Sequence, residues 1–248
     1  MADVLLGSTG SPAPLECESV DWVGRPKDPP VGAFVGLAGG ELAARARGLE
    51  YEVFAEQGYC EPSVDGRVTE YAKWEAASRF HVVVTDADEL IATVRTTAGC
   101  YDDLPVGKFE RWDSYPPDIV VEYASLVVPR SARGAGGAEA LYRSVVHEAV
   151  AIGAGGLVAI GEQWLLDLLN GVYDFGFRQL GPSRWYMGGE CFPMGTSMAD
   201  LWVHLRTRQP TLYAWFLEGI DRVDLRDSTG SVQAPGAAMP ALLPVAGA

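Results

Sequence analysis

The sequence predicts one α/β domain between two irregular ends. Three observations lead to this prediction. First, 48% of the 248 residues are hydrophobic, which is enough for a sizeable core. Second, runs rich in β-branched residues alternate with segments whose apolar residues recur with a helical period. Third, a glycine-rich turn joins a buried strand at 119–128 to an amphipathic helix at 137–152.

The first half of the domain is expected to contain a helix and a β-hairpin. Residues 41–57 carry apolar side chains with a period of 3.6 residues and predict a helix. A polar, Gly/Pro-broken segment follows over 59–75, where we expect a long loop with a short helix. The β-branched segments 79–85 and 89–97 predict two strands, joined by a turn at residues 86–88.

The second half is expected to alternate strands and helices. Pro129 ends the central strand, because proline cannot donate to a β-ladder. After the helix at 137–152 the expected elements are a strand at 157–160, a helix at 162–174, strands at 177–180 and 183–188, and two C-terminal helices at 196–208 and from 210. Those last two helices either pack on the sheet, or cover an acyl pocket or form a dimer contact.

The two ends lack a sustained period. We expect residues 1–40 to be an extended or disordered lead, residues 41–226 to be the domain, and residues 227–248 to be a flexible tail.

Composition excludes several classes of partner and cofactor. The net charge of −14 argues against nucleic acid, which needs clustered Lys and Arg. No apolar run is long enough to span a bilayer, and the N-terminus does not resemble a signal peptide. The cysteines form no CxxC pair and the three histidines have no ligand spacing, so we expect free thiols rather than disulfides, a cytoplasmic location and no metal.

The turn after the central strand has the features of a phosphate-binding loop. Residues 128–138 read VPRSARGAGGA, and backbone N–H groups at the start of a helix bind phosphates well. Arg133, Gly136 and Ala138 fit the pattern Arg/Gln-x-x-Gly-x-Gly/Ala. This resembles the acyl-CoA pyrophosphate loop of the GCN5-related N-acetyltransferase (GNAT) superfamily, with the likeness covering roughly residues 79–187. A glycine-rich turn without a ligand is the alternative.

The resemblance implies a fold and a donor site. The fold would be a mixed, mostly antiparallel central sheet with splayed central strands, flanked by helices, with two additional C-terminal helices. The end of the central strand would pair with pantetheine, and the loop amides would hold the pyrophosphate. The residues implied are Leu126, Val127, Val128, Arg133, Gly134, Ala135, Gly136, Gly137 and Ala138.

A narrower likeness concerns the acceptor site. The segment LEYEVF at 49–54, with the later Glu70, Glu75, Arg95 and Glu122, resembles the autoinducer (acyl-homoserine lactone) synthases and the long-chain N-acyl amino acid synthases. In those families such residues bind the amine substrate. The sequence departs from their pattern at three positions, which hold Glu50, Ala72 and Ser125. These departures argue against homoserine-lactone synthesis and leave the acyl-transfer scaffold intact.

Two residues are candidates for proton transfer. Glu122 lies in an apolar strand, where an unpaired carboxylate would be costly and its pKa would rise toward the range useful to a general base. The alternative is that Glu122 pairs with Arg95 across the sheet. Tyr173 stands near the position of the tyrosine that protonates the leaving thiolate in many GNAT enzymes, although it could be a plain core residue.

The sequence thus predicts an N-acyltransferase that moves an acyl group from acyl-CoA or an acyl-carrier protein to a small amine or amino acid derivative. A carrier protein would need a basic docking patch, for which Arg130, Arg133 and Arg143 are candidates. One alternative is an acetyl-CoA-dependent acetyltransferase acting on a small molecule or a protein. Another is a non-catalytic acyl-CoA-binding protein.

Overall fold

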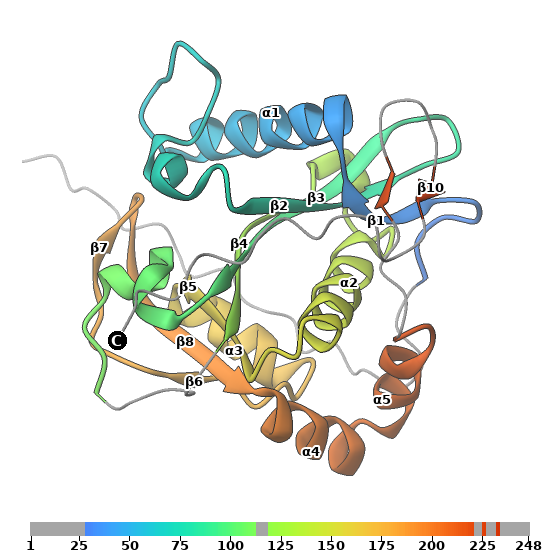
Figure 1. Cartoon of the computed structure of the whole chain (residues 1–248), viewed down its shortest axis with the longest axis vertical. Helices are drawn as coiled ribbons and strands as arrows, with labels where there is room; N and C mark the ends of the chain where they lie inside the picture. The colour runs from blue at the N-terminus through green and yellow to red at the C-terminus, as the bar shows by residue number, and fades with distance from the viewer. Residues whose placement is uncertain (1–27, 113–118, 221–224, 227–231, 234–248) are drawn as a thin grey trace, which may run out of the picture.

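The computed structural model describes residues 28–112, 119–220, 225–226 and 232–233 (Figure 1). The helices are α1 (Gly40–Gln57), α2 (Gly137–Ala151), α3 (Gln163–Gly171), α4 (Met198–Arg208) and α5 (Pro210–Leu217). The strands are β1 (Phe34–Ala38), β2 (Ser78–Val84), β3 (Leu90–Gly99), β4 (Val120–Val127), β5 (Gly156–Gly161), β6 (Arg178–Gln179), β7 (Arg184–Tyr186), β8 (Gly189–Ser197), β9 (Leu225–Arg226) and β10 (Val232–Gln233). Short 3₁₀ turns are η1 (Thr69–Trp74), η2 (Tyr101–Asp103), η3 (Pro105–Lys108) and η4 (Arg130–Ala132).

These strands form one mixed, mostly antiparallel sheet. Its order is β10-β9-β1-β2-β3-β4-β5-β8-β6, with β7 paired to β8. The central pair β4–β5 is parallel, and so is the short pair β1–β9. The predicted hairpin is confirmed as β2 and β3, and the predicted central strand is confirmed as β4.

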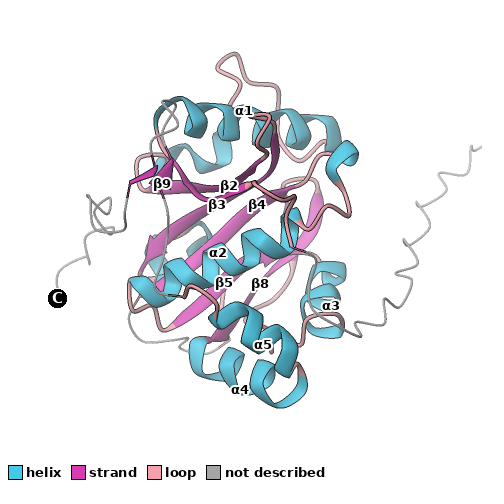
Figure 2. Ribbon diagram, turned by 90° about the vertical axis from the view of Figure 1, so that its right-hand side faces the viewer, coloured by secondary structure: helices cyan, strands magenta, loops and turns pink. Residues whose placement is uncertain are grey.

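Helices cover both faces of the sheet. Phe80, Val82 and Val84 of β2 pack with Leu42 and Ala46 of α1. The alternate residue of β2, Val83, belongs to the main core under α2, because successive side chains of a strand point to opposite faces. Figure 2 shows α2 lying across the sheet, with α1 at the top of the view and α4 and α5 at the bottom. We call the two sides the α1 face and the α2 face.

A buried polar network fixes α2 to β2. The His81 ring nitrogens lie 2.7 Å from Ser144 Oγ and 2.6 Å from Glu148 Oε2. Thr96 Oγ1 also donates to Glu148 Oε2 at 2.9 Å. Burial alone would raise the pKa of Glu148, but His81 and Arg79 outweigh it and hold that pKa below its usual range.

The C-terminal helices pack on the domain. Leu205, Leu212, Trp215 and Phe216 are buried in the same core as the inner side of α2. The His147 ring lies 2.8 Å from the Phe216 carbonyl oxygen, which joins α5 to α2. Ser197 Oγ accepts from the Asp200 N–H at 3.0 Å and caps α4. The packing interpretation therefore accounts for the apolar faces of both helices.

The ordered elements extend beyond the expected domain limits. β1 lies upstream of residue 41 and pairs with β2, and β10 lies within the expected tail. The rest of both ends, residues 1–27 and most of 227–248, lies outside the described residues. β8 was not expected as a separate strand, and α3 ends at Gly171, short of the expected limit at 174.

Two observations bear on the expectations from composition. Cys60, Cys100 and Cys191 are free thiols, whereas Cys17 is outside the described residues. Within the described ranges, the helices are all too short or too polar to cross a bilayer.

Candidate active site

The site is built where the two central strands separate. The β4–β5 ladder pairs Val120 with Gly156 and ends with Glu122 opposite Val158. Beyond that point β5 continues its pairing with β8, while β4 continues along β3. The β5-facing edge of β4 after Glu122 therefore has backbone groups that no β5 residue engages in the ladder, as expected for splayed central strands.

A β-bulge lies in the same part of β4. Ala124 faces Arg95 and Val127 faces Thr93, so Ser125 and Leu126 together oppose a single residue of β3. Ser125 has a left-handed φ of 49°, which is unusual for a residue that is not glycine. The bulge bends β4 between Glu122 and the glycine loop, in the part of the strand that lies beyond its pairing with β5.

Glu122 is buried on the α1 face. Its side chain is 1% exposed, and Oε2 accepts a hydrogen bond of 2.8 Å from the backbone N–H of Val106 in η3. Its other oxygen, Oε1, is buried and has no hydrogen-bond partner among the described residues. Burial raises the pKa of Glu122 to about 8, although the Val106 N–H and the charge of Lys108 oppose the rise. Glu122 is therefore a carboxyl group that can exchange a proton near neutral pH.

Aromatic and polar side chains from short elements surround this carboxyl group. Burial raises the pKa of Tyr186 in β7, and the negative charge of Glu122 raises it further. Burial also raises the pKa of Tyr71 in η1, and the charges of Tyr186 and Glu122 raise it further. The Tyr71 hydroxyl lies beside Ser125. Lys108 Nζ lies 4.8 Å from the Trp74 ring and 5.6 Å from the Tyr186 ring, and it donates to the Glu70 carbonyl oxygen at 3.4 Å. Glu70, Ser125 and Glu122 are thus brought to one region.

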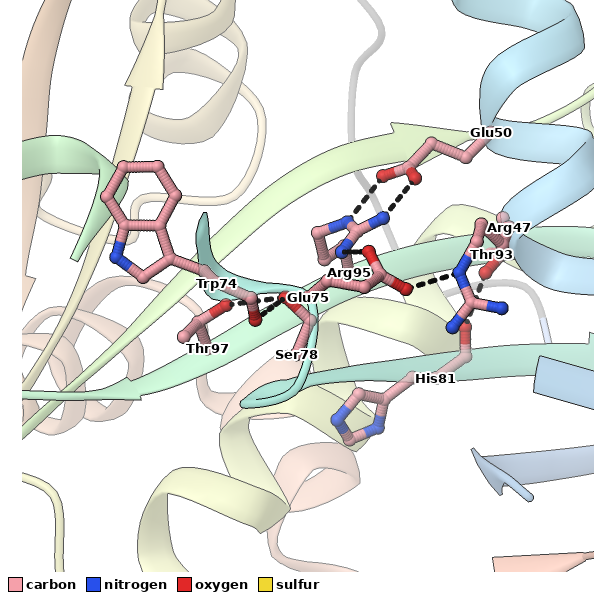
Figure 3. A network of polar contacts seen from close by, with 9 residues as sticks. All are labelled: Arg47, Glu50, Trp74, Glu75, Ser78, His81, Thr93, Arg95 and Thr97. Atoms are coloured by element: carbon pink, nitrogen blue, oxygen red, sulfur yellow. Dashed lines mark hydrogen bonds and ion pairs between the residues drawn. The ribbon is translucent and has the colours of Figure 1, made fainter. Parts of the chain in front are cut away.

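Arg95 belongs to a different cluster, which Figure 3 shows. Its guanidinium makes two hydrogen bonds to Glu50, at 2.8 and 2.6 Å, and one to Glu75 Oε2 at 2.9 Å. Arg47 Nε donates to the other oxygen of Glu75. The Arg95 side chain is 1% exposed, and its charge is held by carboxylates from α1 and from the turn before β2.

The alternative in which Arg95 pairs with Glu122 is wrong. In the β3–β4 ladder Glu122 faces Thr97, and Arg95 faces Ala124. Both side chains project from the α1 face, but Arg95 turns to the carboxylates of Glu50 and Glu75. Tyr71 lies between the two groups, since its ring is 5.0 Å from the Arg95 guanidinium and its hydroxyl is beside Ser125. The Arg95 cluster therefore supports one wall of the Glu122 region.

Glu50 is a buried partner that the sequence reasoning treated only as a departure from a family pattern. The helical spacing could have predicted that Glu50 is buried. Leu42, Ala46 and Glu50 follow one another at four-residue intervals on α1, and all three are buried. A buried carboxylate that stays ionised is expected to pair with a buried cation. Tyr71, Tyr186 and the Val106 N–H were also missed, because only the folded chain brings them to Glu122.

The glycine loop connects β4 to α2 as expected. Gly134 and Gly136 have φ values of 79° and 77°, a conformation that side chains disfavour. Gly136 is the N-cap of α2. Because glycine has no side chain, it cannot accept hydrogen bonds from the first N–H groups of the helix. A Cβ on Gly137 would lie 3.0 Å from the Ala92 Cβ, so glycine lets α2 start close against β3. Arg133 is exposed at the start of this loop.

Tyr173 lies on the α2 face. Its ring stacks on Phe175 at 5.1 Å and contacts Tyr142 of α2 at 5.3 Å, and its hydroxyl donates to Glu139 Oε1 at 3.4 Å. Burial is the main cause of the raised pKa of Tyr173, so the phenol remains protonated. Glu139 is in the first turn of α2, so Tyr173 is near the loop end of that helix. Glu122 and Tyr173 thus approach the splayed strands from opposite faces.

Within the described ranges, no three His, Cys, Asp or Glu side chains are grouped in a way that could hold a metal ion.

Comparison with known proteins adds a fold assignment. No protein-family model and no curated protein matches the sequence. Among solved structures, the chain is similar to BjaI, a CoA-dependent acyl-homoserine lactone synthase with SAM and isopentyl-CoA, at a TM-score of 0.54 and 15% identity over 78% of this chain and 93% of BjaI. It is similar to FeeM, an N-acyl amino acid synthase from uncultured soil microbes, at a TM-score of 0.50 and 13% identity over 69% of this chain and 93% of FeeM.

A third structure, the CoA-dependent acyl-homoserine lactone synthase MesI, matches at a TM-score of 0.51 and 10% identity over 73% of this chain and 88% of MesI. The chain therefore has the GNAT fold, in the form found in acyl-homoserine lactone synthases and an N-acyl amino acid synthase.

Proposed function

We propose that this protein is an N-acyltransferase that moves an acyl group from acyl-CoA or an acyl-carrier protein to a small amine. The observation that supports this most is Glu122: a buried carboxyl group beside the splay of β4 and β5, with one oxygen unengaged and a pKa raised to about 8. A structural carboxylate in a protein core is normally fully hydrogen-bonded. A group that must accept a proton from a bound amine needs a free oxygen and a pKa near the working pH.

In the proposed reaction the donor lies along the open edge of β4. The N–H groups at the start of α2 and in the loop 133–138 hold its pyrophosphate, while Leu126, Val127 and Val128 pair with pantetheine. A backbone N–H near Leu126 or Val127 stabilises the oxyanion. The amine nitrogen bonds to the thioester carbon and passes a proton to Glu122, the carbon–sulfur bond breaks, and Tyr173 gives its proton to the departing thiolate.

The acceptor amine binds in the region of Glu122, where Glu70 and Ser125 also lie. Glu75 and Arg95 act indirectly, by supporting Tyr71 at one side of that region. A cytoplasmic location fits a CoA-dependent reaction.

The decisive experiment compares the wild type with Glu122→Gln. Free thiol release would be followed with acetyl-, hexanoyl- and decanoyl-CoA, each against the common amino acids and simple alkylamines. We expect Glu122→Gln to lose about 100-fold or more in kcat and to bind CoA unchanged by calorimetry, since general base catalysis is worth about 10²–10⁴-fold. Glu148→Gln is the matched control, because it also removes a buried carboxylate but on the α2 face.

The donor series also separates the alternatives. A rate that is highest with acetyl-CoA favours an acetyltransferase, and a rate that rises with chain length favours a long-chain acyltransferase. CoA binding without thiol release from any amine would contradict the enzymatic proposal and favour a non-catalytic binding protein.

A further inference from the structure

Tyr186 is held in a fixed position next to the region of Glu122. It is the last residue of β7 and pairs with Gly189 of β8. Its ring meets Phe109 edge-on at 5.4 Å, immediately after the η3 turn that binds Glu122. The Lys108 and Arg184 cations lie 5.6 and 5.7 Å from the same ring.

The hairpin that carries Tyr186 is itself anchored. A Cβ on Gly188 would lie 2.8 Å from the Gly58 carbonyl oxygen, and a Cβ on Gly189 would overlap the Glu162 carboxylate. The thiol of Cys191 also approaches the Tyr186 carbonyl oxygen, at 3.5 Å. Glycine at these positions lets the hairpin pack against the end of α1 and the start of α3, so the orientation of Tyr186 is set by backbone packing.

The Tyr186 hydroxyl is buried without a hydrogen-bond partner among the described residues, and so is Glu122 Oε1. A buried hydroxyl without a partner is unfavourable, because it has lost its hydrogen bonds to water without replacement. Ser125 Oγ in the same region is also buried without a partner among the described residues, and a group of such oxygens points to a ligand that carries hydrogen-bond donors.

We propose that the Tyr186 hydroxyl is the second acceptor, after Glu122 Oε1, for the N–H groups of the acceptor amine, an assignment that rests on the acyltransferase function proposed above. A neutral primary amine has two N–H bonds and one lone pair. When both N–H bonds donate to these two oxygens, the lone pair is the remaining position on nitrogen and faces the thioester. Tyr186 thereby orients the nucleophile, and Glu122 alone takes the proton when the carbon–nitrogen bond forms.

This arrangement makes a prediction about acceptor class. A primary amine satisfies both oxygens, whereas a secondary amine has a single N–H bond and leaves one oxygen unpaired. The site should therefore prefer primary over secondary amines, and the preference should depend on the Tyr186 hydroxyl.

The test is Tyr186→Phe, which removes the hydroxyl and keeps the ring against Phe109 and Lys108. Tyr123→Phe is the matched control: its hydroxyl is also buried without a partner among the described residues, but its ring packs against Tyr142 and Phe177 on the α2 face. With the best primary amine of the panel and its best CoA donor, we expect Tyr186→Phe to lower kcat/KM for the amine about ten- to thirtyfold. The KM for the donor should stay at the wild-type value, and the urea midpoint should not fall, because the hydroxyl removed has no partner in the folded protein. Tyr123→Phe should keep the wild-type kinetics for both substrates, and its midpoint should not fall either.

The second readout compares a primary amine with its N-methyl derivative. The wild type should favour the primary amine, and Tyr186→Phe should lose most of that preference. Wild-type amine kinetics in Tyr186→Phe, or a loss of rate that accompanies a lower urea midpoint, would overturn the assignment. If the wild type releases no thiol with any amine, the acyltransferase proposal itself fails, which is a separate outcome.

Discussion

At the scale of single residues, Glu122 shows how an apolar strand can bury a carboxyl group and thereby change its pKa. Val120 and Val121 beside it are fully buried and drive β4 into the core, and the carboxyl group is carried in with them. The single N–H from Val106 does not compensate for the loss of water, so the neutral form is favoured. The result is a titratable group poised near physiological pH.

The pH dependence of the rate follows from this environment. A general base works in its ionised form, so we expect kcat/KM for the amine to rise with pH through an apparent pKa of about 8. The measurement needs a weakly basic acceptor, whose own titration falls below this range. Glu122→Gln should lack the limb at pH 8, and an identical limb in that variant would remove Glu122 from the proton transfer.

The sequence indicated the burial of Glu122 but not its neighbours. A carboxylate within VVEYASLVV implies burial, and the structure confirms it. The sequence did not identify the partner of Arg95. A pair between Arg95 and Glu122 was plausible, because the two residues have opposite charges and lie on adjacent strands. Glu50 on α1 and Glu75 before β2 hold Arg95 instead, and these contacts join residues far apart in the chain.

At the scale of elements, the α2 helix is defined by glycines at both ends. Gly136 has a φ of 77° at its start, and Gly153 has a φ of 67° just after its last turn. Glycine adopts this conformation without the steric cost that a Cβ brings. The two residues therefore have the same backbone requirement, whereas the proposed pyrophosphate site involves only the first.

This pair provides a matched test of the donor site. Gly136→Ala and Gly153→Ala should each destabilise the protein by about 1–2 kcal/mol, measured by urea denaturation, because alanine is strained at positive φ. Only Gly136→Ala should also raise the KM for acyl-CoA, since it disturbs the loop amides. Equal donor KM values in the two variants would argue against pyrophosphate binding at this loop.

Sequence patterns predicted some elements better than others. The hairpin β2–β3, the strand β4 and the helix α2 have long, regular apolar patterns and lie where expected. β8 was missed because GECFPMGTS contains two glycines and a proline and has no clear alternation. It is a strand because β5 and β6 pair with its two sides, a tertiary effect that overrides local propensity.

At the scale of the whole molecule, buried and half-buried carboxylates make stability change with pH in opposite directions. Arg95 and Arg47 outweigh burial and lower the pKa of Glu75, and His81 and Arg79 do the same for Glu148. Their stabilisation is present above the ordinary glutamate pKa of 4.5 and is lost as the pH falls through their folded values. Glu122 has a raised pKa, so the folded state binds the extra proton between about pH 4.5 and 8, and stability falls as the pH rises through that window.

Urea denaturation across pH 3–9 would test this balance. We expect the wild-type midpoint to be highest in mildly acidic solution and to decline toward pH 8. Glu122→Gln cannot ionise at this position, so its midpoint should decline less and exceed the wild-type value above pH 8. A parallel pH profile in the two proteins would show that Glu122 does not titrate in this range.

The sequence by itself determined the α/β class, the order of the central elements, the glycine loop and the presence of a carboxylate inside an apolar strand. Those features are local, since they depend on periodicity, on glycine at positive φ and on residues adjacent in the chain. Only the tertiary structure decided that Arg95 binds Glu50 and Glu75, that Tyr71 and Tyr186 surround Glu122, and that Glu122 and Tyr173 lie on opposite faces. These relations depend on which short turns and hairpins pack against the α1 face, and that packing is set by contacts between distant segments.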